Sequence, residues 1–330
     1  MARMLRNLGE KHFQMLVGTG IGFLFGASLI PQTVLLKKYR GVLASYKDGE
    51  EEPVAEDLLE LKDKILARMD IRAEEEAAIK MFTCFGCDVL HRGSLKLRSG
   101  AIIGIPASFS YEKPEDVNRE KLVVNAKEVN WSSGAGTQLL ESLILSKDAK
   151  AFAIAREIGY ANTYHLWADA ILKSIFAYAA YATGFGINTK FHTRSTMKTW
   201  GRVGMYVAIA GVYSFLYLTI SDTYYCNRDN RIDRKTARLN AVYARGGVEY
   251  YEKTLQRNRA LRTLMGASGA KEYTLYGNPQ HIWRQPHVAP TNRRDNLTRY
   301  YKEHLDRLEG KDQEGEGQEG KKLNENNTPQ

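Results

Sequence analysis

Two stretches of this sequence are apolar enough, and long enough, to cross a lipid bilayer. Residues 13–36 read FQMLVGTGIGFLFGASLIPQTVLL and residues 203–221 read VGMYVAIAGVYSFLYLTIS, and neither stretch contains a charged side chain. A helix needs about twenty such residues to cross roughly 30 Å of hydrocarbon. Buried helices of a soluble protein are the alternative, but two apolar runs joined by a polar loop favour a membrane hairpin. The sequence therefore predicts a membrane protein.

A third run supplies the second helix of this hairpin. Residues 174–189 lack charge, and the run extends back to Leu166 past Lys173, whose long side chain can reach the membrane interface. We therefore expect a hairpin over 166–221 and, together with residues 13–36, three membrane spans in all. A single hairpin without the first span is the alternative.

The net charge of +9 has a membrane explanation. The hairpin loop 188–202 holds four lysines and arginines and no acidic residue, and the N-terminus 1–12 is also basic. Basic segments stay on the side from which insertion begins, here cytoplasm or mitochondrial matrix, which puts the polar regions on the opposite side. No recognisable nucleic-acid module is present, so we expect a lipid bilayer and no nucleic acid as partner.

The first apolar run carries three regularly spaced glycines, Gly18, Gly22 and Gly26. Four-residue spacing places them on one helix face, where the missing side chains let another helix approach closely. The alternative is that glycine is simply common in membrane helices. We expect this face to pack against another helix.

The polar regions are predicted to form an α-rich α+β domain. Residues 54–69 place apolar side chains on one helix face, and GAIIGIPASF (100–109) and EKLVVNAKEVNW (120–131) are typical of short strands. After the hairpin, a helical pair is predicted to break at Gly246–Gly247. The predicted parts, in order, are a basic N-terminus (1–12), a first transmembrane helix (13–36), the first part of the polar domain (37–165), the hairpin (166–221) with its basic loop (188–202), the helical C-terminal part of the domain (222–307) and a disordered tail (308–330).

One helix of this domain has the frame of a zinc-peptidase motif. The segment AFAIAREIGY (151–160) keeps the Glu157 of an H-E-x-x-H helix, but Arg156 and Tyr160 stand at the two histidine positions. A guanidinium keeps its protons and has no lone pair for zinc, and tyrosine is a poor replacement for histidine. The residues therefore predict no metal at this helix and no zinc-dependent hydrolysis.

The surrounding sequence resembles the membrane-bound M48 metallopeptidases, a zincin family. The matched places are LILSKDAKAFAIAREIGY, the hairpin that follows it, and RKTARLNAVYARGG, where Arg234 occupies the position of the third zinc ligand. This resemblance implies a helical, degenerate peptidase-like domain that the transmembrane hairpin interrupts, with no cofactor and no enzymatic activity. It also implies that Glu157 pairs with Arg156 or Arg234, and that the helices around Glu157 and Ala237 pack together. A chance match to an ordinary amphipathic helix stays open.

Cys84 and Cys87 form an isolated C-x-x-C pair. Such a pair can be redox-active or can supply half of a metal site, but no second pair and no histidine cluster accompanies it in the sequence. We expect structural or incidental thiols, with a local disulfide or a copper or redox role as the alternative.

Several strings also resemble a narrower family, the mitochondrial transmembrane protein 177 family. They include GIPASF, VNWSSGAG, KEYTLYGN and, as the most specific, GGVEYYEK, and the resemblance covers about residues 95–280. It implies a multi-pass protein of the mitochondrial inner membrane, with its polar domain in the intermembrane space if the basic segments face the matrix.

The same resemblance implies a non-enzymatic assembly factor for cytochrome c oxidase subunit 2. The implied partners are that subunit, its dedicated chaperone and copper metallochaperones. Two alternatives stay open at this point: a membrane zinc metallopeptidase, and a thiol- or copper-handling factor that uses Cys84 and Cys87.

Overall fold

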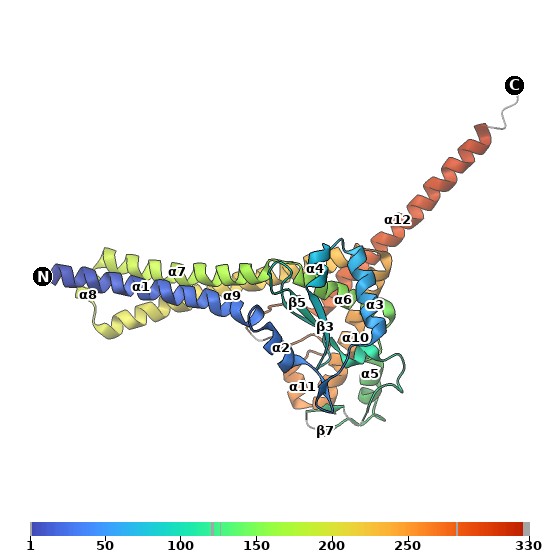
Figure 1. Ribbon diagram of the computed structural model, residues 1–330, viewed down its shortest axis with the longest axis horizontal. Coiled ribbons are helices and arrows are strands. Elements are labelled where there is room, and N and C mark those ends of the chain that lie inside the picture. The colour runs from blue at the N-terminus through green and yellow to red at the C-terminus, as the bar shows by residue number, and fades with distance from the viewer. Residues whose placement is uncertain (1, 120–121, 126, 282, 326–330) are drawn as a thin grey trace.

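The computed structural model describes residues 2–119, 122–125, 127–281 and 283–325. A bundle of three long helices projects from one side of a mixed domain, and a single helix leaves the domain toward the C-terminus (Figure 1). The bundle consists of α1 (Ala2–Leu29), α7 (His165–Phe191) and α9 (Thr199–Ala237), with the short α8 (Thr193–Thr196) in the loop between α7 and α9.

Each bundle helix contains a segment long and apolar enough to cross a membrane. The first segment, Gln14–Gln32, continues from α1 through the 3-10 turn η1 (Ile30–Gln32), and α7 and α9 contain the other two. Large apolar side chains such as Phe23 and Phe215 point outward and are 74% and 69% exposed, which suits a lipid environment. The prediction of a membrane protein with three candidate spans is confirmed.

The basic segments lie at one end of the bundle and the folded domain lies at the other (Figure 1). The start of α1 and the loop that carries α8 share the end that faces away from the domain. In a three-span protein the first span carries the chain from the basic N-terminus to the side of the domain. The hairpin then crosses to the N-terminal side, where its basic loop lies, and returns. Both basic segments are therefore separated from the domain by the membrane.

The predicted packing of the glycine face is wrong within the described chain. A Cβ atom built at Gly18 or Gly22 would meet nothing within 4 Å, and one at Gly26 would meet only Ile30 of the same segment. The helix α1 instead turns larger side chains toward α7: the ring centroids of Phe25 and Trp167 lie 6.1 Å apart. Filling the space between two helices with aromatic side chains leaves the glycine face outside the interface.

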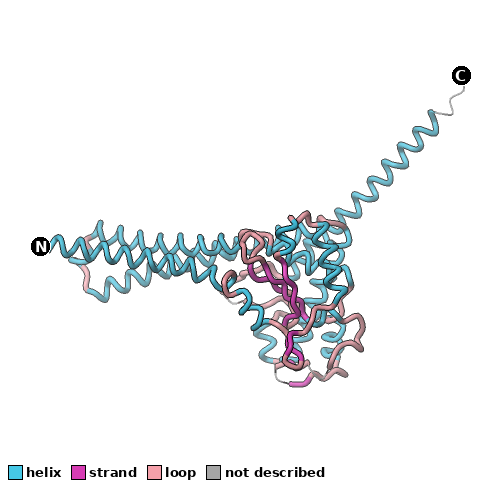
Figure 2. The backbone as a smooth tube through the Cα atoms, in the orientation of Figure 1, coloured by secondary structure: helices cyan, strands magenta, loops and turns pink. Residues whose placement is uncertain are grey.

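The sheet of the domain has three main strands, which gather in one part of it among the helices (Figure 2). The central strand β5 (Ala101–Pro106) pairs parallel with β3 (Ile79–Cys84) and antiparallel with β4 (Leu90–Gly93). All six residues of β5 are buried, which confirms the strand predicted within 100–109. The remaining strands form two short antiparallel pairs, β1 (Tyr46–Lys47) with β2 (Glu50–Glu51) and β6 (Val123–Val124) with β7 (Lys127–Glu128).

Helices make up most of the domain. The predicted amphipathic helix at 54–69 is α3 (Glu56–Arg68), which buries Leu58 and Ile65. The other helical elements are α2 (Leu36–Leu43), α4 (Ala73–Ala77), η2 (Ala107–Ser110), α5 (Gly134–Ser142), α6 (Lys147–Ala161), α10 (Ala241–Met265), α11 (Ala267–Glu272) and α12 (Pro290–Glu325).

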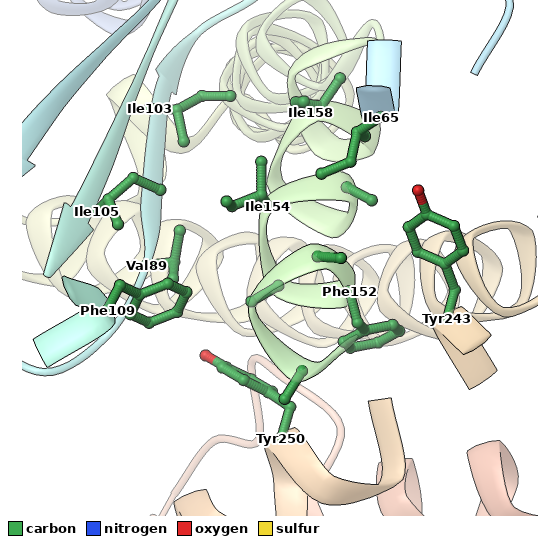
Figure 3. Packing of buried hydrophobic residues seen from close by; sticks show 14 of the residues in the cluster. Ile65, Val89, Ile103, Ile105, Phe109, Phe152, Ile154, Ile158, Tyr243 and Tyr250 are labelled. Atoms are coloured by element: carbon green, nitrogen blue, oxygen red, sulfur yellow. The ribbon is translucent and has the colours of Figure 1, made fainter. Parts of the chain in front are cut away.

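The core surrounds α6, which is buried on nearly all sides. One face of α6 turns Ile154 toward Ile103 and Ile105 of β5, and Phe152 lies on the side of α10 (Figure 3). A helix that is buried all round is a central element of a larger fold and not a surface helix. The polar residues of α6 are therefore held in fixed positions by the packing around them.

The helix α10 runs unbroken through Gly246 and Gly247, so the predicted break there is wrong. A Cβ at Gly246 would lie 2.2 Å from the carbonyl oxygen of Asp148, and one at Gly247 would lie 2.8 Å from the ring of Phe152. The two glycines let α10 approach α6 closely instead of ending a helix. The helical pair breaks earlier, between Ala237 and Ala241.

The C-terminal segment also differs from its prediction. The helix α12 continues to Glu325, through most of the segment 308–330 that we expected to be disordered, and it extends away from the domain (Figure 1). Glutamate, lysine and glutamine are strong helix formers, so this charged segment can extend a helix that begins against the domain. Residues 326–330 lie outside the described residues.

Candidate functional site

A polar cavity of about 830 Å³ lies beside α6. Its walls come from β4, α6, α9, α10 and residues 278–281 and 285–290, which lead into α12. The cavity therefore forms where parts of the chain that are far apart in sequence meet. The helix α6 contributes Arg156, Glu157 and Tyr160 to this wall, the three residues that the peptidase resemblance singled out.

The side chains of Arg156 and Glu157 close on one another. The Arg156 Nε and Nη2 atoms donate to Oε1 of Glu157 at 2.9 and 2.7 Å, and Nδ1 of His91 donates to the other oxygen, Oε2, at 2.6 Å. The Arg156 Nη1 atom donates to the hydroxyl of Tyr251 at 2.9 Å. We call these four residues the Arg156 network. The predicted pairing of Glu157 with Arg156 is confirmed.

This pairing keeps Glu157 ionised inside the protein. Burial alone would raise the pKa of the carboxyl group, but the Arg156 guanidinium and the hydrogen-bonded His91 ring lower it to about 2. Both carboxylate oxygens already accept hydrogen bonds from fixed donors. A carboxylate held in this way is poorly suited to act as a general base for water.

A second cluster surrounds Tyr160. The Tyr160 hydroxyl donates to Oδ1 of Asp229 at 2.7 Å and accepts from Nη2 of Arg293 at 2.9 Å. Arg293 also holds Asp233 through two bonds of 2.6 and 2.7 Å, and Nδ1 of His287 donates to Asp229 at 3.0 Å. We call these five residues the Asp229 network. Because α9 carries Asp229 and Asp233, this network ties the third membrane helix to α6.

The ring of His91 joins the two networks. It stacks on the ring of Tyr160 with centroids 5.3 Å apart, while its Nδ1 atom bonds Glu157. The helices around Glu157 and Ala237 pack together as predicted, through contacts between α6 and α9 that include the Tyr160–Asp229 hydrogen bond.

Arg234 does not belong to this site. Its side chain is exposed, whereas Asp229, Ile232, Asp233, Thr236 and Ala237 form the buried face of α9. The residue of α9 that hydrogen-bonds Tyr160 is Asp229, five positions before Arg234. The sequence DNRID (229–233) thus occupies the place we assigned to RKTAR. The spacing of its two buried acids by one helical turn was the signal that could have corrected the register.

Three further residues of the site could not be found by reading along the sequence. His91 lies in the edge strand β4, and His287 and Arg293 lie near the start of α12. None belongs to a recognisable motif, and each acquires its role only from the packing of distant segments. Among the described residues, no group of three or more His, Cys, Asp and Glu side chains is arranged to hold a metal ion.

The cavity is cationic, and part of its polar lining has no partner within the described chain. Arginines outnumber carboxylates among its lining residues. The Arg228 guanidinium lies over the rings of Tyr160 and Tyr225, at 4.9 and 5.0 Å from their centroids. The Nε atoms of Arg228 and Arg257 and the Oδ1 atom of Asn258 are buried without a hydrogen-bond partner among the described residues. Such atoms can bind a polar or anionic group that enters the cavity.

Cys84 and Cys87 form no disulfide in the structure. Burial raises the pKa of the Cys84 thiol to about 12, whereas Cys87 is exposed at the surface. The Cys84 thiol is therefore protonated near neutral pH, and the thiol is a weaker nucleophile and metal ligand than the thiolate. This environment disfavours a redox or copper role for the pair.

The comparisons with known proteins agree on one family. The sequence profile of the transmembrane protein 177 family matches residues 46–305. Transmembrane protein 177 of Homo sapiens is 33% identical over 295 residues, which cover 87% of this chain and 92% of the relative. The protein of that name from Danio rerio is 30% identical over 292 residues, with 87% and 93% covered. No solved structure matches this one, so the peptidase-like fold stays a prediction from the sequence.

Proposed function

Because the chain belongs to the transmembrane protein 177 family, we propose that it is a non-enzymatic assembly factor of the mitochondrial inner membrane. In this proposal it supports the biogenesis and stability of cytochrome c oxidase subunit 2. It does so by holding that subunit or its dedicated chaperone, together with copper metallochaperones, at the membrane. The folded domain lies in the intermembrane space, and the basic end of the bundle faces the matrix.

The observation that carries a holding function is the Arg156 network. A zinc peptidase needs a glutamate that is free to polarise a metal-bound water. Here Glu157 is engaged by Arg156 and His91 on its two oxygens. The guanidinium supplies the positive charge that a divalent ion would otherwise supply, and it can neither exchange nor activate water. In this proposal the paired side chains stabilise the fold and do not catalyse hydrolysis.

The bundle places the cavity close to the membrane. The helix α9 is one continuous element of 39 residues, about 58 Å long at 1.5 Å per residue. Its first half is apolar, and its last turns bring Arg228 and Asp229 into the cavity wall. A protein segment that has just left the bilayer can therefore reach the cavity without any separate linker, and the unpartnered polar atoms there supply its binding groups.

The test is recovery of partners from mitochondria that express tagged full-length protein in place of the native one. We expect subunit 2 and its chaperone to co-purify with the wild type and subunit 2 to fall when the protein is deleted. Reversing the charge in the cavity with Arg228→Glu should reduce that recovery. Arg234→Glu is the matched control, because it makes the same charge change on the exposed side of the same helix.

Two results would contradict the proposal. Equal recovery of the partners with Arg228→Glu and wild type, at equal protein level, would remove the cavity from the binding surface. Chelator-sensitive cleavage of a peptide by the purified protein, lost in Glu157→Gln, would assign it to the peptidases instead.

A further inference from the structure

A second cavity, of about 510 Å³, lies within the membrane bundle. It opens between α7 and α9 near the end that faces away from the domain, with Gln14 of α1 at its edge. Its walls are mostly apolar and include Tyr181, Gly184, Phe185, Tyr206, Ile209 and Ala210, with Asn188 among them. Arg194 and Arg202, from the basic loop, complete the lining. The cavity thus combines an apolar wall with cations at one end.

The cavity is built into the packing of the two helices. The hydroxyls of Thr183 and Tyr213 lie 2.7 Å apart, and Asn188 donates to the hydroxyl of Tyr206. At Gly184 the helices come close, because a Cβ there would lie 3.4 Å from the Tyr206 ring. These contacts hold α7 and α9 at a defined separation. The volume of the cavity, about 510 Å³, is within the range of roughly 300–1,000 Å³ that is typical of small-molecule sites.

The Arg202 side chain points to the chemistry of an occupant. Its Nε atom is buried and has no hydrogen-bond partner within the described chain. A buried donor of this kind destabilises the protein unless an acceptor reaches it. The surrounding loop 188–202 contains no acidic residue that could neutralise the guanidinium. An anion that enters the cavity would fit both the charge and the unpartnered Nε atom of Arg202.

The order of these groups along the bundle identifies the anion. With the three candidate spans in a bilayer, the apolar wall would lie at the depth of the hydrocarbon and the two arginines, at the end of the bundle, would lie at the level of lipid head groups. Basic pockets between membrane helices are suited to acidic head groups, and a planar guanidinium matches phosphate oxygens in pairs. We propose that this cavity binds one anionic phospholipid, with an acyl chain along the apolar wall and its phosphate at Arg202 and Arg194.

The test is lipid retention by the full-length protein in detergent, measured by native mass spectrometry. The protein is titrated with dioleoyl phosphatidylglycerol, with dioleoyl phosphatidylcholine, and separately with glycerol phosphate or inorganic phosphate. We expect a retained adduct of one phosphatidylglycerol, weaker retention of phosphatidylcholine, and no adduct with the two soluble phosphates. Equal retention of the two lipids, or binding of soluble phosphate alone, would overturn the proposal.

Matched variants locate the site. Arg202→Gln should weaken phosphatidylglycerol retention by at least about fivefold, the scale of one basic residue at a membrane surface. Lys198→Gln removes the same charge from the same loop but lies outside the cavity lining, so it should retain the lipid. Equal losses in the two variants would mean attraction by overall charge and no specific site.

A second pair of variants tests the apolar wall. Ala210→Trp fills the cavity while leaving both arginines in place, and it should also abolish retention. Val212→Trp adds the same side chain at an exposed position of α9 that does not line the cavity, and should change little. If Ala210→Trp retained the lipid as well as wild type, the acyl chain would not lie in this cavity. Helix content by circular dichroism identifies any variant that fails to fold, and the comparison of lipids on wild type stands without the variants.

Discussion

Arg156 and Glu157 are adjacent in the sequence, and their side chains nevertheless turn back on one another, with Nη2 of the arginine 2.7 Å from Oε1 of the glutamate inside the core. This contact is unusual for a helix, because neighbouring side chains diverge by about 100° and partners usually lie three or four residues apart. It forms here because His91 and Tyr251, from other segments, draw the two side chains into the same space. The pair therefore depends on the tertiary fold.

Removing Arg156 should destabilise the domain strongly. Arg156→Ala leaves Glu157 buried with only His91 beside it, and breaking a buried pair in this way costs about 3–5 kcal/mol. We expect this loss in the free energy of unfolding, measured by denaturant titration in detergent. Arg234→Ala is the control and should stay within about 0.5 kcal/mol, as exposed substitutions do. A double variant, Arg156→Leu with Glu157→Leu, should recover part of the loss, and no recovery would mean that the pair is not the cause.

The stability of the domain should fall in acid. The pKa of Glu157 is about 2 in the folded protein, against 4.5 for the unperturbed group. Protons therefore bind the unfolded chain first, so the stability that Glu157 supplies is complete above pH 4.5 and is lost as the pH falls toward 2. Glu157→Gln should flatten this part of the profile of unfolding free energy against pH. Glu60→Gln, on the exposed surface, should leave it unchanged.

Gly246 should not tolerate a side chain. The methyl group of Gly246→Ala would lie 2.2 Å from the Asp148 carbonyl oxygen, so α10 and α6 would have to separate. Overpacking of a core costs about 1–3 kcal/mol, which should appear as a lower unfolding midpoint. Gly134→Ala is the comparison, because a Cβ at that helix start meets nothing within 4 Å. Equal effects of both changes would contradict the close approach of the two helices.

The buried thiol of Cys84 should react slowly. With the pKa of Cys84 at about 12, iodoacetamide at neutral pH should label it far more slowly than an unfolded control sample, as read by mass spectrometry. The double variant Cys84→Ser with Cys87→Ser should retain partner recovery from mitochondria. Loss of that recovery without loss of protein level would support the thiol or copper alternative.

Two predictions that the structure overturns have a common cause. Both rest on glycines judged from the sequence around them: the three glycines of α1 predict helix packing, and the pair Gly246–Gly247 predicts a helix end. In each case the outcome depended on a neighbour: Phe25 fills the interface of α1, and α6 comes so close to α10 that only glycine fits. A local pattern shows which contacts and backbone conformations a residue permits. The segment that packs against the residue decides which of them forms.

The residues of the candidate site also divide into those that the sequence indicates and those that only the fold brings together. The helix with Arg156, Glu157 and Tyr160 could be singled out from a ten-residue string, together with the pairing of Glu157 with Arg156. The prediction for α9 is displaced by five residues, because the charges on several faces of this helix obscure the one-turn spacing of Asp229 and Asp233 that marks its buried face. His91, His287 and Arg293 reach the cavity by folding alone.

The sequence by itself determined that this chain enters a membrane, how many segments can cross it and which ends share a side. These properties follow from the length and charge of single segments, because the bilayer acts on each helix separately. Only the tertiary structure decided how each helix is rotated and which buried charges meet. Those choices depend on close packing between segments far apart in the chain, and no single segment contains that information.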